Sequence, residues 1–460
     1  MTTTSTTAPD LATLEGDLSP GALATDPDVV EKYRRDWTAS EAAGVPLGVV
    51  RARDVADVQV TMRWAAAHGI PIVPRGAGSG LSGGSCAVDG CIVLSLERMR
   101  TVEIDRGTRT AVVEPGALNV EVKKAAAEHG LWYPPDPSSF EICSIGGNVA
   151  TNAGGLCCVK YGVTTDYVLG LDVVLADGTF VRLGGQRIKD VAGLSLLKLF
   201  VGSEGTLGIV TRAVLRLVPP QPPAATLVAT FPTVEAAANS VVAIGAVLRA
   251  SMMELMDAAA INAVEDYVTM GLDRSAGAML IAQSDAPGAA RSEEIALMQR
   301  ECEAHGAKEC FVTDDPAEGE QFAAARRAAF PAIERRGAMM LEDVGVPVPL
   351  LPQLLGGIAD IAARHRVEIP VVAHAGDGNT HPIVIYPAGD AEAQARAALA
   401  FDEVMAIAIR LGGTITGEHG IGRLKRAALP AQLGPEVMAL THRIKAALDP
   451  QGILNPGAGF

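Results

Sequence analysis

Two histidines in the C-terminal half of the chain have the spacing of a shared metal site. His374 and His381 lie in β-rich stretches that flank the sequence Gly-Asp-Gly-Asn at residues 376–379. This pattern predicts a β-hairpin with residues 376–379 as its loop, which would place the two histidines directly opposite each other. Directly opposed residues have Cβ atoms about 4.5–5.5 Å apart. Both imidazoles can then bind one metal ion, or they can form a stacked, hydrogen-bonded pair without metal.

A carboxylate and a third histidine follow at Glu418 and His419, in the sequence TGEHGIGR at residues 416–423. Glycines on both sides allow the backbone to bend sharply and to direct the two side chains inward. Glu418 can complete a His-His-carboxylate set with open positions for substrate, and His419 can accept a proton beside it. A solvent-exposed loop is the alternative for this pair.

The glycine-rich stretch PRGAGSGLSGG at residues 74–84 contains a G-x-G-x-x-G pattern at 78–83. A Rossmann dinucleotide site needs a strand before this pattern and a helix directly after it. Residues 70–73 supply the strand, but the chain then turns into a β-rich run at 91–96. The stretch therefore favours a phosphate nest of successive backbone N–H groups, to which Arg75 can add positive charge. A purely structural turn is the alternative.

Three further loops are rich in small residues, at 134–139, 144–155 and 199–209. Small residues allow the backbone to approach a large flat ligand closely. One cofactor with a pyrophosphate and a broad ring system would explain all four loops.

In this order, the four loops resemble the FAD-binding domain of the vanillyl-alcohol oxidase / p-cresol methylhydroxylase (PCMH) superfamily, from about residue 41 to the C-terminus. The sequences HAGDGNTH at 374–381 and GEHGIGR at 417–423 are similar to those of its D-2-hydroxyacid-oxidising branch. That branch includes D-lactate dehydrogenases, D-2-hydroxyglutarate dehydrogenase and the FAD-bearing subunit of glycolate oxidase. Several superfamily members attach flavin through a histidine in the first loop. Residues 69–128 contain no histidine, so non-covalent FAD is expected.

The resemblance implies that the glycine-rich stretch contacts the FAD pyrophosphate, and that the other three loops surround the rest of FAD. The implied FAD-binding residues are Pro74, Arg75, Gly76, Ala77, Gly78, Ser79, Gly80, Leu81, Ser82, Gly83, Pro135, Asp136, Ser138, Ser139, Ser144, Gly147, Asn148, Thr151, Asn152, Gly205, Ile209, Val210, Glu418 and Asn455.

The resemblance also assigns roles in a reaction. It implies that His374, His381 and Glu418 bind a divalent metal, zinc-like, and that His419 is the base. Arg326, in FAAARRAAFP, would bind the substrate carboxylate, with the adjacent arginine as the alternative. The expected reaction is metal-assisted hydride transfer from a D-2-hydroxy acid to flavin N5, which yields the 2-oxo acid.

Two departures from the hydroxyglutarate-oxidising members concern the substrate. Those members have a lysine where this chain has Leu341, and an asparagine where it has Ile383. Apolar residues there would leave a second carboxylate unpaired, so glycolate or D-lactate is the expected substrate. The alternatives are a non-catalytic flavin-binding electron-transfer subunit, or an oxidase of sugar lactones, alditols or phenols on the same fold.

The order of strands and helices that must position these residues predicts an α+β protein. The resemblance implies a PCMH-type FAD-binding domain of two α+β subdomains at 41–219, after an N-terminal extension at 1–40. The proline-rich stretch 219–223 predicts a linker. An α+β cap domain with an antiparallel sheet follows at 220–411 and holds the substrate, and segment 412–460 is expected to return to the FAD domain. The predicted local elements are helices at 55–68 and 119–129, strands at 91–96, 110–114 and 171–175, and a hairpin turn at 176–178.

Composition excludes several classes of partner. The net charge of −15 and the 4% aromatic content argue against nucleic acid. The seven cysteines form no C-x-x-C pair, so no iron–sulfur cluster within this chain is expected. The electron acceptor is left open, with an iron–sulfur or flavin partner subunit as one option. The odd number of scattered cysteines predicts a reducing cytoplasm, with association to a membrane through partners as an option. No signal peptide and no membrane span are expected, because the start lacks signal-peptide features and no long apolar run occurs.

Overall fold

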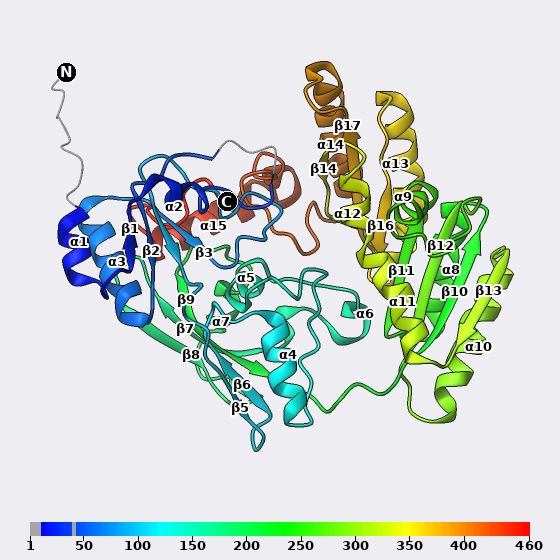
Figure 1. The fold of residues 1–460 in the computed structure, drawn as a ribbon, viewed down its shortest axis with the longest axis horizontal. Coiled ribbons are helices and arrows are strands. Elements are labelled where there is room, and N and C mark those ends of the chain that lie inside the picture. The colour runs from blue at the N-terminus through cyan, green and yellow to red at the C-terminus, as the bar shows by residue number, and fades with distance from the viewer. Residues whose placement is uncertain (1–10, 39–42) are drawn as a thin grey trace.

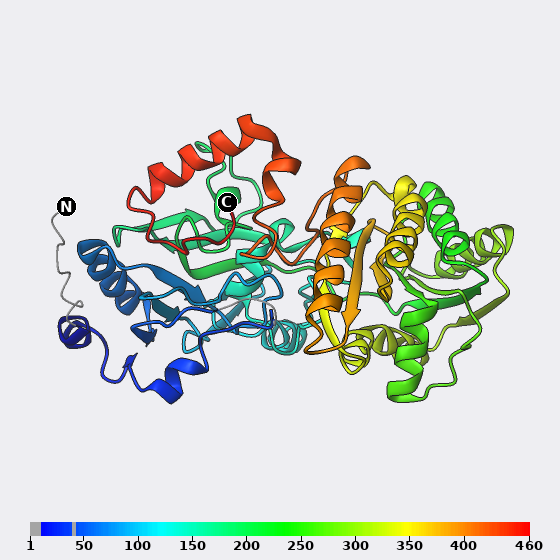
Figure 2. The same cartoon turned by 90° about the horizontal axis from the view of Figure 1, so that it is seen from above.

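Two lobes of mixed helices and sheets stand side by side along the long axis of the molecule (Figure 1; Figure 2). The computed structural model describes residues 11–38 and 43–460. The first lobe contains the N-terminal elements and the last helix, and the second lobe contains the segment between them. This arrangement confirms the α+β fold class expected from the sequence.

The first lobe contains a four-stranded sheet and a five-stranded sheet. Their strands are β1 (Leu23–Ala24), β2 (Gly48–Arg51), β3 (Ile72–Arg75), β4 (Ile92–Ser95), β5 (Val102–Asp105), β6 (Thr110–Val113), β7 (Val168–Val174), β8 (Phe180–Gly184) and β9 (Ile209–Arg216). The order of the first sheet is β1-β2-β4-β3, with β2 and β3 each parallel to β4. The second sheet is antiparallel in the order β5-β6-β9-β7-β8. The glycine-rich stretch leaves the carboxyl end of β3, the edge of a parallel sheet where ligands commonly bind.

The helices of the first lobe are α1 (Leu11–Asp17), α2 (Pro27–Glu31), α3 (Val55–His68), α4 (Asn119–Glu128), α5 (Ile145–Thr151), α6 (Cys158–Tyr161), η1 (Thr164–Asp166), α7 (Leu197–Phe200) and α15 (Leu429–Leu448). Helix α3 begins after Asp54, whose carboxylate accepts hydrogen bonds from the first-turn N–H groups. The predicted helices at 55–68 and 119–129 are thus confirmed as α3 and α4. The predicted strands at 91–96, 110–114 and 171–175 are β4, β6 and β7, and the predicted turn joins β7 to β8.

The predicted N-terminal extension, residues 1–40, is described only over 11–38. In this part, β1 pairs with β2 and α1 packs against α3. Residues 1–10 and the predicted boundary between residues 40 and 41 lie outside the described residues.

The second lobe is built on an eight-stranded antiparallel sheet. Its strands are β10 (Ala225–Phe231), β11 (Met252–Asp257), β12 (Ala278–Ser284), β13 (Glu309–Thr313), β14 (Ala338–Leu341), β15 (Val344–Gly345), β16 (Val371–His374) and β17 (Asn379–Tyr386). The order is β13-β10-β12-β11-β16-β17-β14, and β15 also pairs with β17. Its helices are α8 (Val234–Val247), α9 (Ala258–Val268), α10 (Ala289–Ala304), α11 (Pro316–Arg327), α12 (Ala329–Glu334), η2 (Val348–Leu350), α13 (Leu351–His365) and α14 (Ala391–Arg410). The proline-rich stretch 219–223 connects β9 of the first lobe to β10 of the second.

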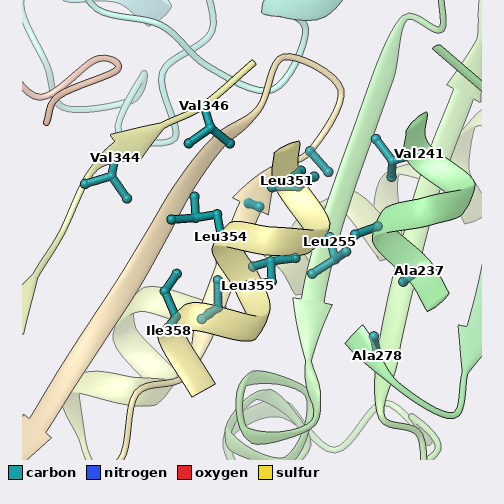
Figure 3. Close-up of a cluster of buried hydrophobic side chains, with 14 of the residues drawn as sticks. Ala237, Val241, Leu255, Ala278, Val344, Val346, Leu351, Leu354, Leu355 and Ile358 are labelled. Carbon is teal, nitrogen blue, oxygen red and sulfur yellow. The ribbon is translucent and has the colours of Figure 1, made fainter. Parts of the chain in front are cut away.

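Helix α13 anchors the core of the second lobe (Figure 3). Its buried residues Leu351, Leu354, Leu355 and Ile358 recur at helical spacing and belong to one cluster with Leu255 of the central strand β11. This core fixes the sheet that carries His374 and His381.

The last part of the chain returns to the first lobe, where α15 lies on the side opposite the N-terminal elements (Figure 2). Its residues Ile444 and Leu448 pack against the buried cluster that contains Leu171 and Leu215. Lys445 donates from Nζ to the carbonyl of Thr206, at 2.7 Å. Ile72 of β3 donates its N–H to Ile453, and the N–H of Asn455 donates to Ile72. The loop between α14 and α15 therefore has one end in each lobe. Among the described residues, no helix combines the length and apolar character needed to cross a membrane.

Substitution of Leu354 tests the role of this core. Leu354→Ala should lower the free energy of unfolding by about 2–5 kcal/mol, because a fully buried leucine leaves a cavity. Urea unfolding of the purified protein measures the change. Leu399→Ala on α14, where the leucine is 57% exposed, is the control and should change it by less than about 0.5 kcal/mol. Equal losses for both variants would contradict the assignment.

Candidate active site

A cleft in the structure collects most of the residues that the resemblance assigned to FAD. The assigned residues on its wall are Pro74, Arg75, Gly76, Ala77, Gly78, Ser79, Gly80, Leu81, Ser82, Ser138, Ser139, Ser144, Gly147, Asn148, Thr151, Gly205, Ile209, Val210 and Glu418. The assigned residues that do not line it are Gly83, Pro135, Asp136, Asn152 and Asn455. His381, His419 and Arg326 line the same cleft, so both lobes contribute to one site.

His374, His381 and Glu418 form a compact group of side chains that could hold a metal ion. Their ligand atoms all lie within 4.8 Å of one another. Glu418 Oε1 lies 3.2 Å from His374 Nε2 and 3.3 Å from His381 Nε2. Burial alone would raise the pKa of Glu418, but the two histidines outweigh it and lower that pKa. The carboxylate is therefore ionised between the two imidazoles.

The hairpin that carries the histidines differs in register from the prediction. His374 pairs with Asn379 and His381 pairs with Val372, so the loop is residues 375–378 and the histidines are not directly opposite. Asn379 belongs to β17 and not to the loop, because it pairs with Gly345 of β15 as well as with His374. Gly378 ends the loop with a φ of 81°, and a Cβ there would lie 2.1 Å from the carbonyl oxygen of Val346. A shift of two residues keeps both histidines on one face of the sheet, where their ring centroids lie 5.1 Å apart.

Glu254 is a buried carboxylate that the sequence analysis missed. It lies on β11 opposite His374, and its Oε1 lies 2.8 Å from His374 Nδ1. Its Oε2 forms an ion pair with Arg326 Nε at 2.9 Å. Burial alone would lower the pKa of His374, but Glu254 and Glu418 outweigh it and raise that pKa. Because Glu254 contacts Nδ1 of His374, the other ring nitrogen, Nε2, is left to face His381 and Glu418. The position of Glu254 within the otherwise apolar run 252–256 was the available signal.

Asp343 is a second missed residue, and it shapes the loop that carries Glu418. Its Oδ2 accepts hydrogen bonds from the N–H groups of Gly417, Glu418 and His419 at 2.8–2.9 Å, and from the Thr416 hydroxyl at 2.7 Å. Its Oδ1 accepts from the side-chain amide of Asn379 at 2.7 Å. Asp343 thus joins the loop to the hairpin. The Glu-Asp pair before the short strand β15 was the only signal in the sequence.

His419 lies beside the cluster. Its ring stacks on His381 with centroids 4.9 Å apart and an interplanar angle of 14°. Burial lowers the pKa of His419 to about 4. The imidazole is therefore neutral near pH 7 and can accept a proton.

The glycine-rich stretch presents unpaired N–H groups on the cleft wall. Among the described residues, none accepts a hydrogen bond from the backbone N–H groups of residues 78–84. The carbonyls turn away: that of Gly80 accepts from Trp37, and that of Ser82 from Arg423 and Leu424. A run of free donors with its acceptors occupied elsewhere is the geometry of an anion nest. Residues 76–91 contain no helix, so the stretch is not a Rossmann site.

Arg75 was predicted to add positive charge to the phosphate nest, but its guanidinium makes its hydrogen bond within the protein. The guanidinium is buried, and its Nη1 donates to the carbonyl of Arg35 at 2.8 Å. Burial lowers its pKa. Arg75 thus holds residue 35 as well as lining the cleft.

Two residues of the first lobe hold the glycine-rich stretch and the Glu418 loop together. Glu204 accepts from the N–H groups of Ile421 and Gly422 at 2.8 and 2.7 Å. Asn455 donates to the carbonyls of Gly84 and Glu204. Asn455 therefore does not line the cleft itself but holds two residues that do, Gly84 and Glu204. Gly154 also fits closely, since a Cβ there would lie 2.6 Å from Glu418 Oε2.

Comparison with known proteins identifies the architecture. Residues 46–184 match the family described as FAD binding domain, and residues 221–458 match the family described as FAD linked oxidases, C-terminal domain. The chain belongs to the FAD-linked oxidases. This FAD-linked oxidase is 39% identical to the glycolate oxidase subunit GlcD of Bacillus subtilis (strain 168), over 96% of this chain and 93% of that protein.

Two further relatives are named for different substrates. The chain is 34% identical to the D-lactate dehydrogenase of Archaeoglobus fulgidus, over 93% of this chain and 95% of that protein. It is also 34% identical to the D-2-hydroxyglutarate dehydrogenase of Xanthomonas citri pv. viticola, over 99% of this chain and 97% of that protein. A solved structure of p-cresol methylhydroxylase with substrate bound matches with a TM-score of 0.81 at 18% identity, over 97% of this chain and 95% of that one. This last match supports the PCMH-type fold.

The cleft of this FAD-linked oxidase fits its cofactor. The free N–H groups of residues 78–82 and 84, which line the cleft, can receive the two phosphates. The loops at 138–151 and 205–210 line the same cleft with small residues, which leaves room for the rings.

Asp343→Asn tests the positioning of the Glu418 loop. The amide keeps one acceptor oxygen but loses the charge that four donors share at Oδ2, so stability should fall by about 2–3 kcal/mol. Chemical denaturation measures the loss. Asp314→Asn, at a carboxylate with 66% exposure, is the matched control and should be neutral. A neutral Asp343→Asn variant would mean that the loop is held by other contacts.

Proposed function

We propose that this chain oxidises a D-2-hydroxy acid to the 2-oxo acid with non-covalent FAD, and that glycolate or D-lactate is the substrate. The observation that carries the proposal is the group formed by His374, His381 and Glu418, adjacent to the cleft that also contains Arg326 and His419. Relatives named glycolate oxidase subunit and D-lactate dehydrogenase support the same substrate class.

The side chains fit a divalent cation, which we propose is zinc. Two imidazole nitrogens and one carboxylate oxygen form a ligand set that leaves a coordination position open for substrate. Glu254 at His374 Nδ1 supports this reading, because metal-binding histidines commonly pair their other nitrogen with a carboxylate. A hydrogen-bonded histidine pair is less well supported, since both Nε2 atoms face Glu418 and not each other.

Arg326 is suited to hold the substrate carboxylate. The residue lines the cleft, and its Nη2 is buried with no hydrogen-bond partner among the described residues. A buried, unsatisfied guanidinium nitrogen is costly, and a carboxylate in the cleft would relieve that cost. Arg327 also lines the cleft but is paired with Glu320, so it is the weaker choice.

His419 is suited to take the hydroxyl proton. Its neutral ring stacks on His381, and its backbone N–H is fixed by Asp343. When bound, the cation lowers the pKa of the substrate hydroxyl and the flavin accepts the hydride from Cα. The remaining wall around Arg326 includes Phe330, Leu341 and Ile383, which favours a short or apolar side chain on the substrate.

The oxidation also needs an electron acceptor and a location. Relatives named as subunits support a partner protein that takes the electrons. A cytoplasmic location belongs to the same proposal, because all seven cysteines are free thiols.

Measurement of the metal content of the purified protein tests whether His374, His381 and Glu418 bind a cation. The purified protein should hold a divalent cation that His374→Ala and Glu418→Gln each remove, because each variant loses a ligand. Elemental analysis measures the cation, and His442→Ala, at an exposed histidine on α15, is the control. Chelator treatment should abolish turnover while the flavin spectrum is retained. Full metal loading in Glu418→Gln would contradict the ligand set.

Anaerobic reduction of the flavin tests the substrate. D-lactate or glycolate should bleach the yellow protein, whereas L-lactate and D-2-hydroxyglutarate should do so poorly. Arg326→Lys should lower kcat/KM by about 100-fold, since lysine lacks the planar fork for a carboxylate. Arg335→Lys, at an exposed arginine, is the matched control. A folded but colourless protein, or equal reduction by both lactate enantiomers, would refute the proposal.

A further inference from the structure

The segment 186–199, which follows β8 and includes the first three residues of α7, exposes an unusual number of apolar side chains. Of its residues, only Leu197 is not classed as exposed. The exposed apolar residues are Ile188 at 73%, Val191 at 97%, Leu194 at 84%, Leu196 at 42% and Leu199 at 39%. Single exposed apolar residues are ordinary, but five within one short segment indicate a surface that another molecule covers.

The fold of this lobe does not account for these side chains. The backbone of the segment forms local contacts, such as the N–H of Arg187 to the carbonyl of Gly185 and the N–H of Leu196 to that of Leu194. The described residues therefore leave the apolar face uncovered.

The charge of the segment indicates the kind of molecule that covers it. The segment carries Arg187, Lys189 and Lys198 against one acidic residue, Asp190, a net charge of +2 in a chain of net charge −15. Asp190 pairs with Arg187, while Lys189 and Lys198 have no carboxylate partner among the described residues. A basic apolar face fits an acidic partner. A twofold contact between two copies of this face would bring its cations together, which disfavours self-association.

The segment leads directly to the flavin cleft. It runs into α7, and the residues that follow, Phe200, Ser203, Glu204 and Gly205, line the cleft. The N–H of Glu204 donates to the carbonyl of Ala150 on the same wall. A protein bound on this face would therefore lie next to the wall of the cofactor site.

We propose that residues 186–199 are the docking surface for an acidic, electron-accepting protein. The inference rests on the proposed function, which requires an oxidant for the reduced flavin. The partner takes the two electrons released when the hydroxy acid becomes the oxo acid, and two protons pass to water. Val191 and Leu194 supply the apolar centre of the contact, and Lys189 and Lys198 attract the acidic partner.

Flavin reoxidation by cell extract tests the surface. The holoprotein is reduced with stoichiometric dithionite, and its anaerobic reoxidation is followed by absorbance after addition of desalted extract from source cells that lack this gene. The double variant Val191→Glu, Leu194→Glu should slow reoxidation by about tenfold or more, because acidic side chains replace the apolar centre. Reoxidation by dichlorophenol-indophenol, a small dye that needs no docking surface, should be unchanged.

The matched control is Val247→Glu, Leu399→Glu, which changes two side chains of 56% and 57% exposure on the second lobe. This control should reoxidise at the wild-type rate. Equal rates for both double variants with extract would overturn the proposal. Dithionite reduction makes the result independent of whether a hydroxy acid is the substrate.

Vesicle sedimentation separates a protein partner from a lipid surface. The holoprotein is centrifuged with vesicles of phosphatidylcholine and phosphatidylglycerol, and neither wild type nor variant should sediment with them. Sedimentation of wild type that is lost in Val191→Glu, Leu194→Glu would overturn the proposal in favour of an anionic membrane surface.

Discussion

Two buried carboxylates from opposite lobes hold the loop of residues 416–422, and the whole candidate site depends on them. Asp343 of the second lobe accepts the N–H groups of residues 417–419, and Glu204 of the first lobe accepts those of residues 421 and 422. The loop is irregular, and no strand in the described part of the chain pairs with it to satisfy these donors. A buried carboxylate is stable only when it is well hydrogen-bonded, so loop and carboxylates require each other. Glu418 and His419 are thereby fixed relative to both lobes.

The same principle operates around His374. Glu254 is fully buried and lies between the imidazole of His374 and the guanidinium of Arg326. Removal of one member of such a group leaves an uncompensated charge, which typically costs about 3–5 kcal/mol. Stability and chemistry are therefore difficult to separate at this position by a single substitution. This is why the tests above rely on metal content, spectra and substrate preference as well as on rates.

The sequence predicted much of the fold because its signals are local. Helix α3 has a capping aspartate and ends at a glycine, and the runs that became β4, β6 and β7 are short and β-rich. The loops that line the cleft were found through their small residues and a family resemblance. Physical reasoning on the glycine-rich stretch also excluded a Rossmann helix correctly.

The residues that the sequence did not reveal act through long-range contacts. Glu254 pairs with His374 across 120 positions, and Asp343 reaches the loop at 416–419 across more than 70. No local pattern encodes such partners. The predicted register of the histidine hairpin was wrong for a similar reason: Gly345 of β15, a separate segment of the chain, pairs with Asn379 and makes it part of β17.

Glu254 shares one negative charge between an imidazole and a guanidinium. An anion that draws Arg326 away from Glu254 would leave more of that charge to His374 and would strengthen its hold on a cation. By thermodynamic linkage, a cation on His374 would improve the affinity of Arg326 for an anion by the same factor. The two binding events on either side of this carboxylate would thus be cooperative, with neither ligand needing to touch the other.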